Sequence, residues 1–319
     1  MKSTGDLGNS AARRSGRTWR DNKALSVGIT AVVYAGALVL AVILVGLSGI
    51  SAPLAQIALG TLIATIVVFA VSVAVDNSSM YDPYWSLQPL AIAGFYLWSD
   101  RGEIDARQVL VTVLVLLYAV RLTSNFYRDW PGLRKEDFRY VGFRRRSGRF
   151  YWPVSFFGIH LFPTIMVFLG CLPLYAVAGP SVDAFHWLDI VAALITLAAV
   201  GIAFVADEQL RVFRRDPANR GRCIRTGLWA RSRHPNYLGE IMTWWGLWLF
   251  ALAAGPGWWW TVVGAAAITL MFVFVSVPMM EKRALATREG YRQYRDETPM
   301  LLPGWRSQPA ATDGADRTG

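Results

Sequence analysis

The chain has 319 residues, of which 54% are hydrophobic and 17% charged, and its net charge is +10. This composition excludes an ordinary soluble domain and favours a polytopic membrane protein. The two cysteines and three histidines show no disulfide framework or metal-ligand spacing, so no metal site is expected. The basic residues alternate with apolar runs, which also makes nucleic acid a poor fit as a partner.

Eight apolar segments approach the length of about 17 to 25 residues that crosses a bilayer. In chain order they cover approximately 24–50, 53–75, 87–98, 109–123, 154–178, 185–205, 238–254 and 258–277. The segment 87–98 is short, so it is either a full span that uses Trp85 and Ser86 or a re-entrant piece. We therefore predict an all-α polytopic membrane bundle with about seven or eight transmembrane helices.

The distribution of arginine and lysine predicts the orientation of this bundle. Basic residues gather in the N-terminal tail and in 128–149, 211–233 and 282–306, whereas the other connections carry almost none. The positive-inside rule then places both termini and the basic loops in the cytoplasm, and we expect a multi-pass protein of a bacterial inner membrane. Basic residues of the tail and of the Arg144-Arg145-Arg146 run are expected to contact anionic membrane lipids.

No internal repeat is present, and no loop is long enough to hold a separate domain. We predict one transmembrane domain over 21–306, with its cofactor-binding half in 207–306. The flanking segments 1–20 and 307–319 are rich in small and charged residues, which predicts disordered tails.

A polar segment opens the apolar run that follows residue 234. It reads Ser-Arg-His-Pro-Asn-Tyr-Leu-Gly-Glu over 232–240. Pro235 suits the first turn of a helix, and Asn236, Tyr237 and Glu240 would then share a face. A carboxylate such as Glu240 is costly at this depth, which indicates function, although a salt bridge that only anchors the helix is the alternative.

An arginine-rich loop precedes this segment. Residues 211–222 can offer several guanidinium groups to phosphates, which favour arginine over lysine because recognition is bidentate. The same arginines could bind lipid headgroups. Asp207 and Glu208 favour a nucleotide, because acids weaken a lipid-binding patch but can accept hydrogen bonds from ribose or amide groups. No glycine-rich dinucleotide fingerprint is present, so a Rossmann fold is not expected.

The runs 207–240 and 281–303 together resemble the C-terminal domain of the steroid 5-alpha-reductase family, in particular its bacterial branch of uncharacterised multi-span membrane proteins. The first half is similar more loosely, through Asp82-Pro83-Tyr84-Trp85 and Tyr118-Ala119-Val120-Arg121. The resemblance implies a membrane-embedded reductase that holds NADPH on the cytoplasmic side. It also implies reduction of a carbon–carbon double bond conjugated to a carbonyl on a lipid-like substrate.

The resemblance assigns roles by position. The implied cofactor-binding residues are Asp207, Arg211, Arg214, Arg222, Arg233, His234, Asn236, Tyr237, Glu240, Arg283 and Tyr291. The implied catalytic residues are Tyr118 as the donor at the substrate carbonyl, Asp82 as a stand-in for an unmatched family glutamate, and Glu240 near the nicotinamide.

Two other functions fit the same sequence. Isoprenylcysteine and phospholipid methyltransferases share an Arg-His-Pro-x-Tyr-x-Gly motif and use S-adenosylmethionine, which lacks phosphates and needs fewer arginines. An inactive membrane scaffold or lipid-binding protein is the second alternative. Asn236 and Glu240, together with Asp207, Arg214 and Arg222, favour the reductase.

Overall fold

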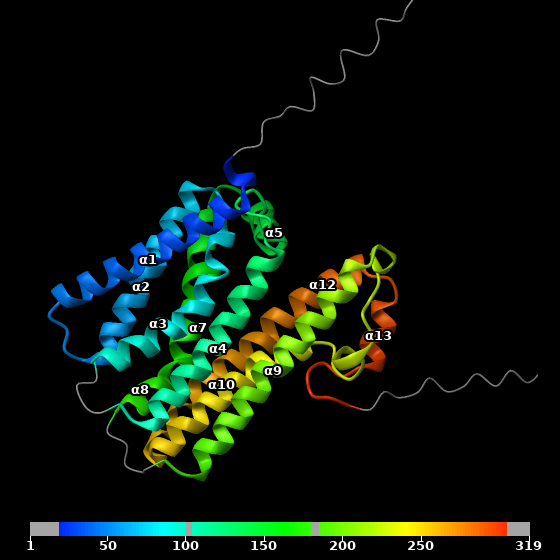
Figure 1. Cartoon of the computed structure of the whole chain (residues 1–319). Helices are drawn as coiled ribbons and strands as arrows, with labels where there is room; N and C mark the ends of the chain where they lie inside the picture. The colour runs from blue at the N-terminus through cyan, green and yellow to red at the C-terminus, as the bar shows by residue number, and fades with distance from the viewer. Residues whose placement is uncertain (1–18, 100–103, 180–184, 305–319) are drawn as a thin grey trace, which may run out of the picture. The chain divides into compact units, whose positions relative to one another are not determined.

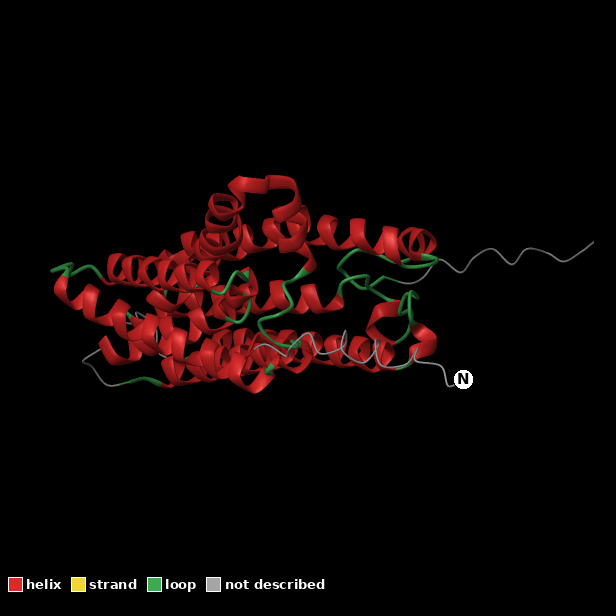
Figure 2. Ribbon diagram, turned by 90° about the horizontal axis from the view of Figure 1, so that it is seen from above, coloured by secondary structure: helices red, strands yellow, loops and turns green. Residues whose placement is uncertain are grey.

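The computed structural model describes residues 19–99, 104–179 and 185–304 and folds them into helices, with no strand among them (Figures 1 and 2). The predicted all-α class is therefore confirmed. Contacts divide the chain into two compact units: unit 1, residues 1–180, and unit 2, residues 181–319. The predicted tails, 1–20 and 307–319, lie outside the described residues except for Trp19 and Arg20.

Unit 1 consists of helices joined by short connections. Its α-helices are α1 (Lys23–Leu47), α2 (Pro53–Ala74), α3 (Tyr84–Ser99), α4 (Ala106–Asp129), α5 (Phe138–Ser147), α6 (Tyr151–Ser155), α7 (Phe162–Gly170) and α8 (Leu172–Ala178). The 3-10 helices η1 (Trp19–Asp21), η2 (Ser78–Tyr81) and η3 (Gly148–Phe150) and the π-helix η4 (Phe156–Leu161) lie between them.

Unit 2 begins with a long helix and ends with a short one. Its α-helices are α9 (Trp187–Arg215), α10 (Pro235–Ala254), α11 (Val262–Met271), α12 (Val277–Thr287) and α13 (Tyr291–Glu297). The 3-10 helices η5 (Pro217–Asn219), η6 (Gly227–Ala230) and η7 (Pro256–Thr261) and the π-helix η8 (Phe272–Ser276) connect them.

In the described part of the chain, six helical segments are long and apolar enough to cross a membrane. They are Lys23–Leu47, Pro53–Ala74, Ala106–Asp129, Phe138–Ala178, Trp187–Arg215 and Pro256–Thr287. By this measure the chain is a multi-pass membrane protein. Two predicted spans, α3 and α10, are not among the six: α3 has only 16 residues, and α10 carries polar residues along its 20. The count of seven or eight and the orientation stay predictions.

Local sequence accounts for several helix starts. Asp105 accepts from the backbone N–H of Gln108, whose side chain accepts in return from Asp105, which forms a capping box at α4. Asn22 caps α1 through Leu25 N–H. Pro235 occupies the first turn of α10, as predicted, because its missing N–H has no partner to lose there.

The two π-helices have a common cause in the sequence. Pro163 follows η4 closely, and Pro278 follows η8 in the same way. A proline within a helix cannot donate to the carbonyl one turn earlier, so the preceding turn widens. Each widened turn changes the direction in which the neighbouring side chains point. Such π-bulges often lie at functional sites.

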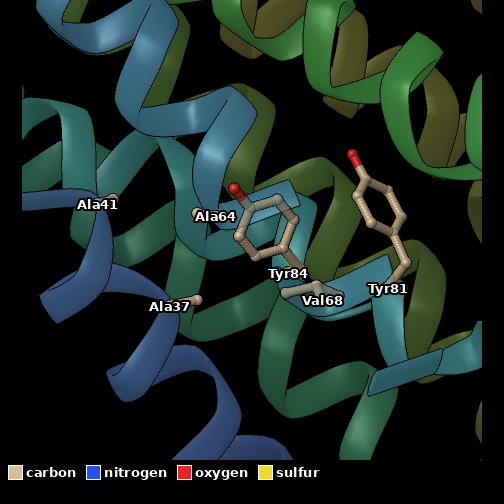
Figure 3. Packing of buried hydrophobic residues seen from close by; sticks show 6 residues of the cluster. All are labelled: Ala37, Ala41, Ala64, Val68, Tyr81 and Tyr84. Atoms are coloured by element: carbon tan, nitrogen blue, oxygen red, sulfur yellow. The ribbon is translucent and has the colours of Figure 1, made fainter. Parts of the chain in front are cut away.

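The packing of α1 on α2 forms one core of unit 1. Figure 3 shows Ala37 and Ala41 of α1 facing Ala64 and Val68 of α2, with the rings of Tyr81 and Tyr84 nearby. The two tyrosine rings are 5.4 Å apart between centroids. Small residues on both helices allow close approach, and the aromatic rings fill the remaining space.

Helices α9 and α10 form an antiparallel pair in unit 2, and two glycines of α10 set their separation. A Cβ added at Gly239 would lie 2.5 Å from the carbonyl oxygen of Ala199, and one at Gly246 would lie 2.1 Å from Thr196 Oγ1. Both positions therefore require glycine, because a larger residue would force the helices apart. The glycine of the Arg-His-Pro-x-Tyr-x-Gly motif has this packing role.

We predict that Gly239→Ala destabilises unit 2 by about 1–3 kcal/mol, the usual cost of overpacking a close contact. The matched control is Gly201→Ala on α9, where an added Cβ meets nothing within 4 Å. Thermal unfolding followed by helical circular dichroism should show a lower midpoint for the first variant only. Equal midpoints for Gly239→Ala and the wild type would contradict this account of the helix pair.

Candidate functional site

The antiparallel pair brings together two residues that the sequence analysis had assigned to one site. Asn236, in the first turn of α10, donates from Nδ2 to Asp207 Oδ1 of α9 at 3.1 Å. Both side chains are half-buried. A carboxylate and an amide held side by side on two helices offer both hydrogen-bond donors and acceptors to a polar ligand.

Glu240 lies one helical turn deeper than Asn236 on α10. It is 5% exposed, whereas Asn236 remains half-buried. The spacing of four residues puts both on the side of α10 that carries the Asp207 contact. Three of the predicted residues, Asp207, Asn236 and Glu240, therefore come from the same end of the α9–α10 pair.

Tyr237 points to another neighbour. Its ring stacks on the imidazole of His234, with centroids 5.4 Å apart and planes 9° from parallel. It also lies 4.9 Å from the ring of Phe272 in η8. Tyr237 therefore contributes to the packing between α10 and the C-terminal helices of unit 2.

Arg233 and His234 share one carboxylate acceptor on α12. Arg233 Nε donates to Glu281 Oε1 at 2.8 Å, and His234 Nε2 lies 3.1 Å from the same oxygen. Arg233 Nη1 also donates to the carbonyls of Arg295, at 2.7 Å, and Thr298, at 2.5 Å. The guanidinium thus joins the start of α10 to α12 and to the C-terminal end of α13.

Backbone contacts continue this attachment past α13. Arg233 N–H donates to Pro299 O at 2.9 Å, and His234 N–H donates to Met300 O at 3.2 Å. The phenol of Tyr294 donates to Trp229 O at 2.6 Å. The C-terminal segment is therefore bound along the polar stretch that precedes α10. Glu281 was not among the site residues predicted from the sequence, although it opens the run 281–303 that carries part of the family resemblance.

The arginine-rich stretch 211–222, predicted as a loop, begins inside α9, because this helix continues to Arg215 and therefore contains Arg211 and Arg214. Most of the stretch is exposed. Arg211 forms an ion pair with Glu208, one turn earlier on α9. Arg214 and Arg222 are exposed, and so is Arg283 on α12. The loop is attached to α9 by Trp229 Nε1, which donates to Ala206 O at 3.0 Å. This attachment keeps the exposed arginines of the loop close to the end of α9.

Tyr291 belongs to a buried cluster of unit 2. It is 4% exposed and packs with Ala284 and Tyr294, and with the half-buried Cys223 of the loop. Burial raises the pKa of Tyr291 to about 12. Its phenol is therefore protonated at neutral pH.

The two predicted catalytic residues of unit 1 have separate surroundings. Tyr118 is buried on α4, and the guanidinium carbon of Arg121 lies 5.9 Å from its ring centroid. Asp82, at the end of η2, accepts from the phenol of Tyr140 and lies 3.5 Å from Arg139 Nη2. A role of Asp82 beside the phenol of Tyr118 stays a prediction.

Asp82 also has an unusual acidity. Burial raises its pKa from 3.8 to about 6, although the nearby Arg139 guanidinium opposes the change. A carboxyl whose pKa is raised by folding stabilises the protein fully below its unfolded pKa, and this contribution is lost as the pH rises through about 6.

We predict that Asp82→Asn removes this pH dependence. Relative to wild type, the variant should gain about 2 kcal/mol of unfolding free energy between about pH 4 and about pH 7, on top of a constant offset from the changed hydrogen bonds. Denaturant unfolding at several pH values measures this difference. Asp76→Asn, at a more exposed carboxylate that pairs with Arg144, is the control. A difference that does not change with pH would refute the burial account.

We predict that Arg233→Ala loosens the C-terminal segment. Removing one partner of a largely buried ion pair costs about 3–5 kcal/mol, because the other charge stays buried. Trypsin should then cleave around Arg292 and Arg295 faster than in wild type. Gln293→Ala is the control, because it removes only an exposed hydrogen bond to Glu297 on α13 and leaves the trypsin sites at Arg292 and Arg295 in place. Equal cleavage in Arg233→Ala and wild type would contradict the attachment.

Comparison with known proteins finds sequence similarity over most of this chain. An uncharacterised protein of Schizosaccharomyces pombe, C594.04c, is 29% identical over 262 residues, which cover 74% of this chain and 76% of the yeast protein. No solved structure matches significantly. The family described as proteins of unknown function, DUF1295, matches residues 68–298, which include parts of both units and every candidate site residue named above. The chain therefore belongs to the DUF1295 family.

Proposed function

We propose that unit 2 binds NADPH and that the protein reduces a carbon–carbon double bond conjugated to a carbonyl on a lipid-like substrate. The observation that carries the proposal is the hydrogen bond between Asn236 and Asp207, with Glu240 one turn deeper. These groups can accept from, and donate to, the amide and hydroxyl groups of a nucleotide. The resemblance to the steroid 5-alpha-reductase family implies that the same three residues bind the cofactor.

The donor set of unit 2 fits a cofactor that carries phosphates. Arg214 and Arg222 are exposed at the end of α9 and in the following loop, where guanidinium groups can bind phosphate oxygens in pairs. When bound, NADPH would supply the hydride. The protein would hold the cofactor and keep water from the reacting groups.

Several predicted contacts have an indirect role in this proposal. Arg233 and His234 are occupied by Glu281 and by backbone carbonyls. We propose that they hold the C-terminal segment in place and thereby shape the site. Tyr118, with Asp82, remains the predicted donor to the substrate carbonyl, and the binding proposal rests on unit 2 alone.

A methyltransferase that uses S-adenosylmethionine remains the second candidate, because the motif that it shares with this chain does not distinguish the two cofactors. The motif residues that it shares with this chain, Arg233, His234 and Gly239, all have contacts that serve the fold. They would suit either cofactor. Asp207, Asn236 and the exposed arginines therefore distinguish the two functions, and they favour a phosphate-bearing nucleotide.

The proposal extends to location. We propose a bacterial inner membrane, with the cofactor site facing the cytoplasm, because the arginine-rich segments mark that side. Exposed arginines at the end of α5, Arg145 and Arg146, would then contact anionic lipids.

We predict that NADPH raises the thermal stability of the purified protein and that S-adenosylmethionine does not. A ligand present at 100 times its Kd stabilises the folded state by about 2.7 kcal/mol. Asn236→Ala should reduce the shift, and so should the double variant Arg214→Ala with Arg222→Ala. The controls are Gln293→Ala, which removes a surface amide of α13, and the double variant Arg145→Ala with Arg146→Ala.

The pattern of shifts decides between the functions. A shift with S-adenosylmethionine alone would favour the methyltransferase. No shift with either cofactor would refute both and leave a scaffold or lipid-binding protein. A shift with NADPH that all variants retain would move the site away from the α9–α10 pair.

A further inference from the structure

A second group of polar residues lies deep in unit 1 and includes none of the residues discussed as cofactor contacts. Ser72 on α2, Ser78 on η2, Ser155 on α6 and His160 on η4 are each 0% exposed. Buried polar side chains cost free energy unless they are paired, and in a membrane bundle buried ionisable groups often take part in proton relays.

These residues form a continuous hydrogen-bonded chain that ends at a carboxylate. His160 Nδ1 lies 3.4 Å from Ser155 Oγ, which lies 2.9 Å from Ser78 Oγ. Ser78 Oγ lies 2.6 Å from the phenol oxygen of Tyr151, and this phenol donates to Glu136 Oε1 at 3.0 Å.

Elementary hydrogen-bond chemistry gives the chain one direction. An ionised carboxylate only accepts, so Tyr151 donates to Glu136. The phenol oxygen then accepts from Ser78, and Ser78 accepts from Ser155. At the far end, the Ser155 carbonyl lies 3.0 Å from His160 Nδ1 and can only accept, which places the proton on Nδ1. The three hydroxyl hydrogens of the chain therefore point toward Glu136, and the single Nδ1 hydrogen of His160 faces both the carbonyl of Ser155 at 3.0 Å and its hydroxyl at 3.4 Å.

The two ends of the chain differ in their access to solvent. His160 Nε2 lies 3.1 Å from Ser72 Oγ in the sealed interior. The carboxylate of Glu136 is bound by Arg144 Nε at 3.2 Å, and the Arg144 side chain is 32% exposed. The chain thus leads from a buried imidazole to a charged pair near the surface.

The widened turn η4 explains how this alignment arises. His160 lies within the π-helix that precedes Pro163, and Ser155 lies just before it. In a regular α-helix, residues five apart do not face each other, whereas the backbone hydrogen bonds of a π-helix join residues five apart. The π-helix therefore brings Ser155 and the His160 imidazole into contact.

We propose that this chain is a proton path between Glu136 and His160. When the imidazole gains a proton at Nε2, the Nδ1 proton passes to Ser155, and the hydroxyl protons of Ser155, Ser78 and Tyr151 each move to the next oxygen. The last proton converts the Glu136 carboxylate into a carboxylic acid, and His160 is neutral again. Reversal of the same steps carries a proton inward. Such a path serves a buried reaction that takes up or releases a proton, and it does not depend on NADPH binding by unit 2.

The neighbours of the imidazole provide a matched control. The Tyr81 ring of η2 lies 5.0 Å from the imidazole of His160, between centroids. On α2, the Phe69 ring lies 5.2 Å from the same imidazole, and Ser72 Oγ lies 3.1 Å from its Nε2. The phenol of Tyr81 is hydrogen-bonded to Thr164 Oγ1 at 2.8 Å, so it stands outside the chain. Tyr81 and Tyr151 are equally buried, at 2% each.

The test measures exchange of the His160 ring proton with water. The full chain, with 15N-labelled histidine, is placed in lipid nanodiscs and studied by NMR; it has three histidines, and His160→Gln identifies the signal. In Tyr151→Phe, exchange at Nδ1 should slow by roughly tenfold or more, within the range that one positioned proton-transfer group contributes. Tyr81→Phe should exchange like wild type.

Other results overturn the proposal. Unchanged or faster exchange in Tyr151→Phe would show that the proton leaves by local opening, because a weaker packing contact accelerates opening. Equal slowing in Tyr81→Phe would show a general packing effect. If Tyr151→Phe loses its helical circular dichroism, Ser155→Ala provides the same comparison. The thermal shift with NADPH is measured on the same variants, so that loss of the proton path and loss of cofactor binding are distinguished.

Discussion

The structure depends on one constraint: a polar group inside an apolar helical bundle must find a partner within the protein. Each buried polar feature described above satisfies it in a different way. Asp207 and Asn236 pair across two helices, and Glu281 accepts from Arg233 and His234. In unit 1, serine hydroxyls and a phenol connect His160 to Glu136. Partners of this kind restrict how the helices can pack, so the same contacts that could serve function also specify the fold.

The motif that first suggested a function combines two kinds of residue. Arg233, His234 and Gly239 have structural roles: the first two attach the C-terminal segment, and the glycine allows α9 to approach α10. Asn236 lies between them in sequence and contacts Asp207 of α9, and Glu240 directly follows Gly239, one turn beyond Asn236. This division explains why one motif can resemble two enzyme families with different cofactors. The residues that shape the fold are shared, whereas those that we propose to contact a cofactor can differ.

Two prolines change the local helix geometry in a way that the sequence analysis did not predict. Pro163 and Pro278 each follow a π-helix, and both lie inside segments apolar enough to span a membrane. The sequence analysis predicted continuous spans over 154–178 and 258–277, whereas the structure has longer helical segments, each interrupted by a π-helix. The widened turns change which side chains meet, because residues five apart come to share a face. The contact of Ser155 with His160 is one result.

The helical class, most helix positions and the start of α10 at Pro235 could be predicted from the amino-acid sequence, because they follow from apolar length and from local backbone chemistry. Asp207, Asn236 and Glu240 could also be selected as candidates. Which polar groups pair becomes visible only in the folded protein. Asn236 and Asp207 are 29 residues apart, Arg233 and Glu281 are 48 apart, and Ser72 and His160 are 88 apart. Such pairs depend on the register and separation of packed helices, which arise from many weak contacts along their whole length and leave no local pattern in the sequence.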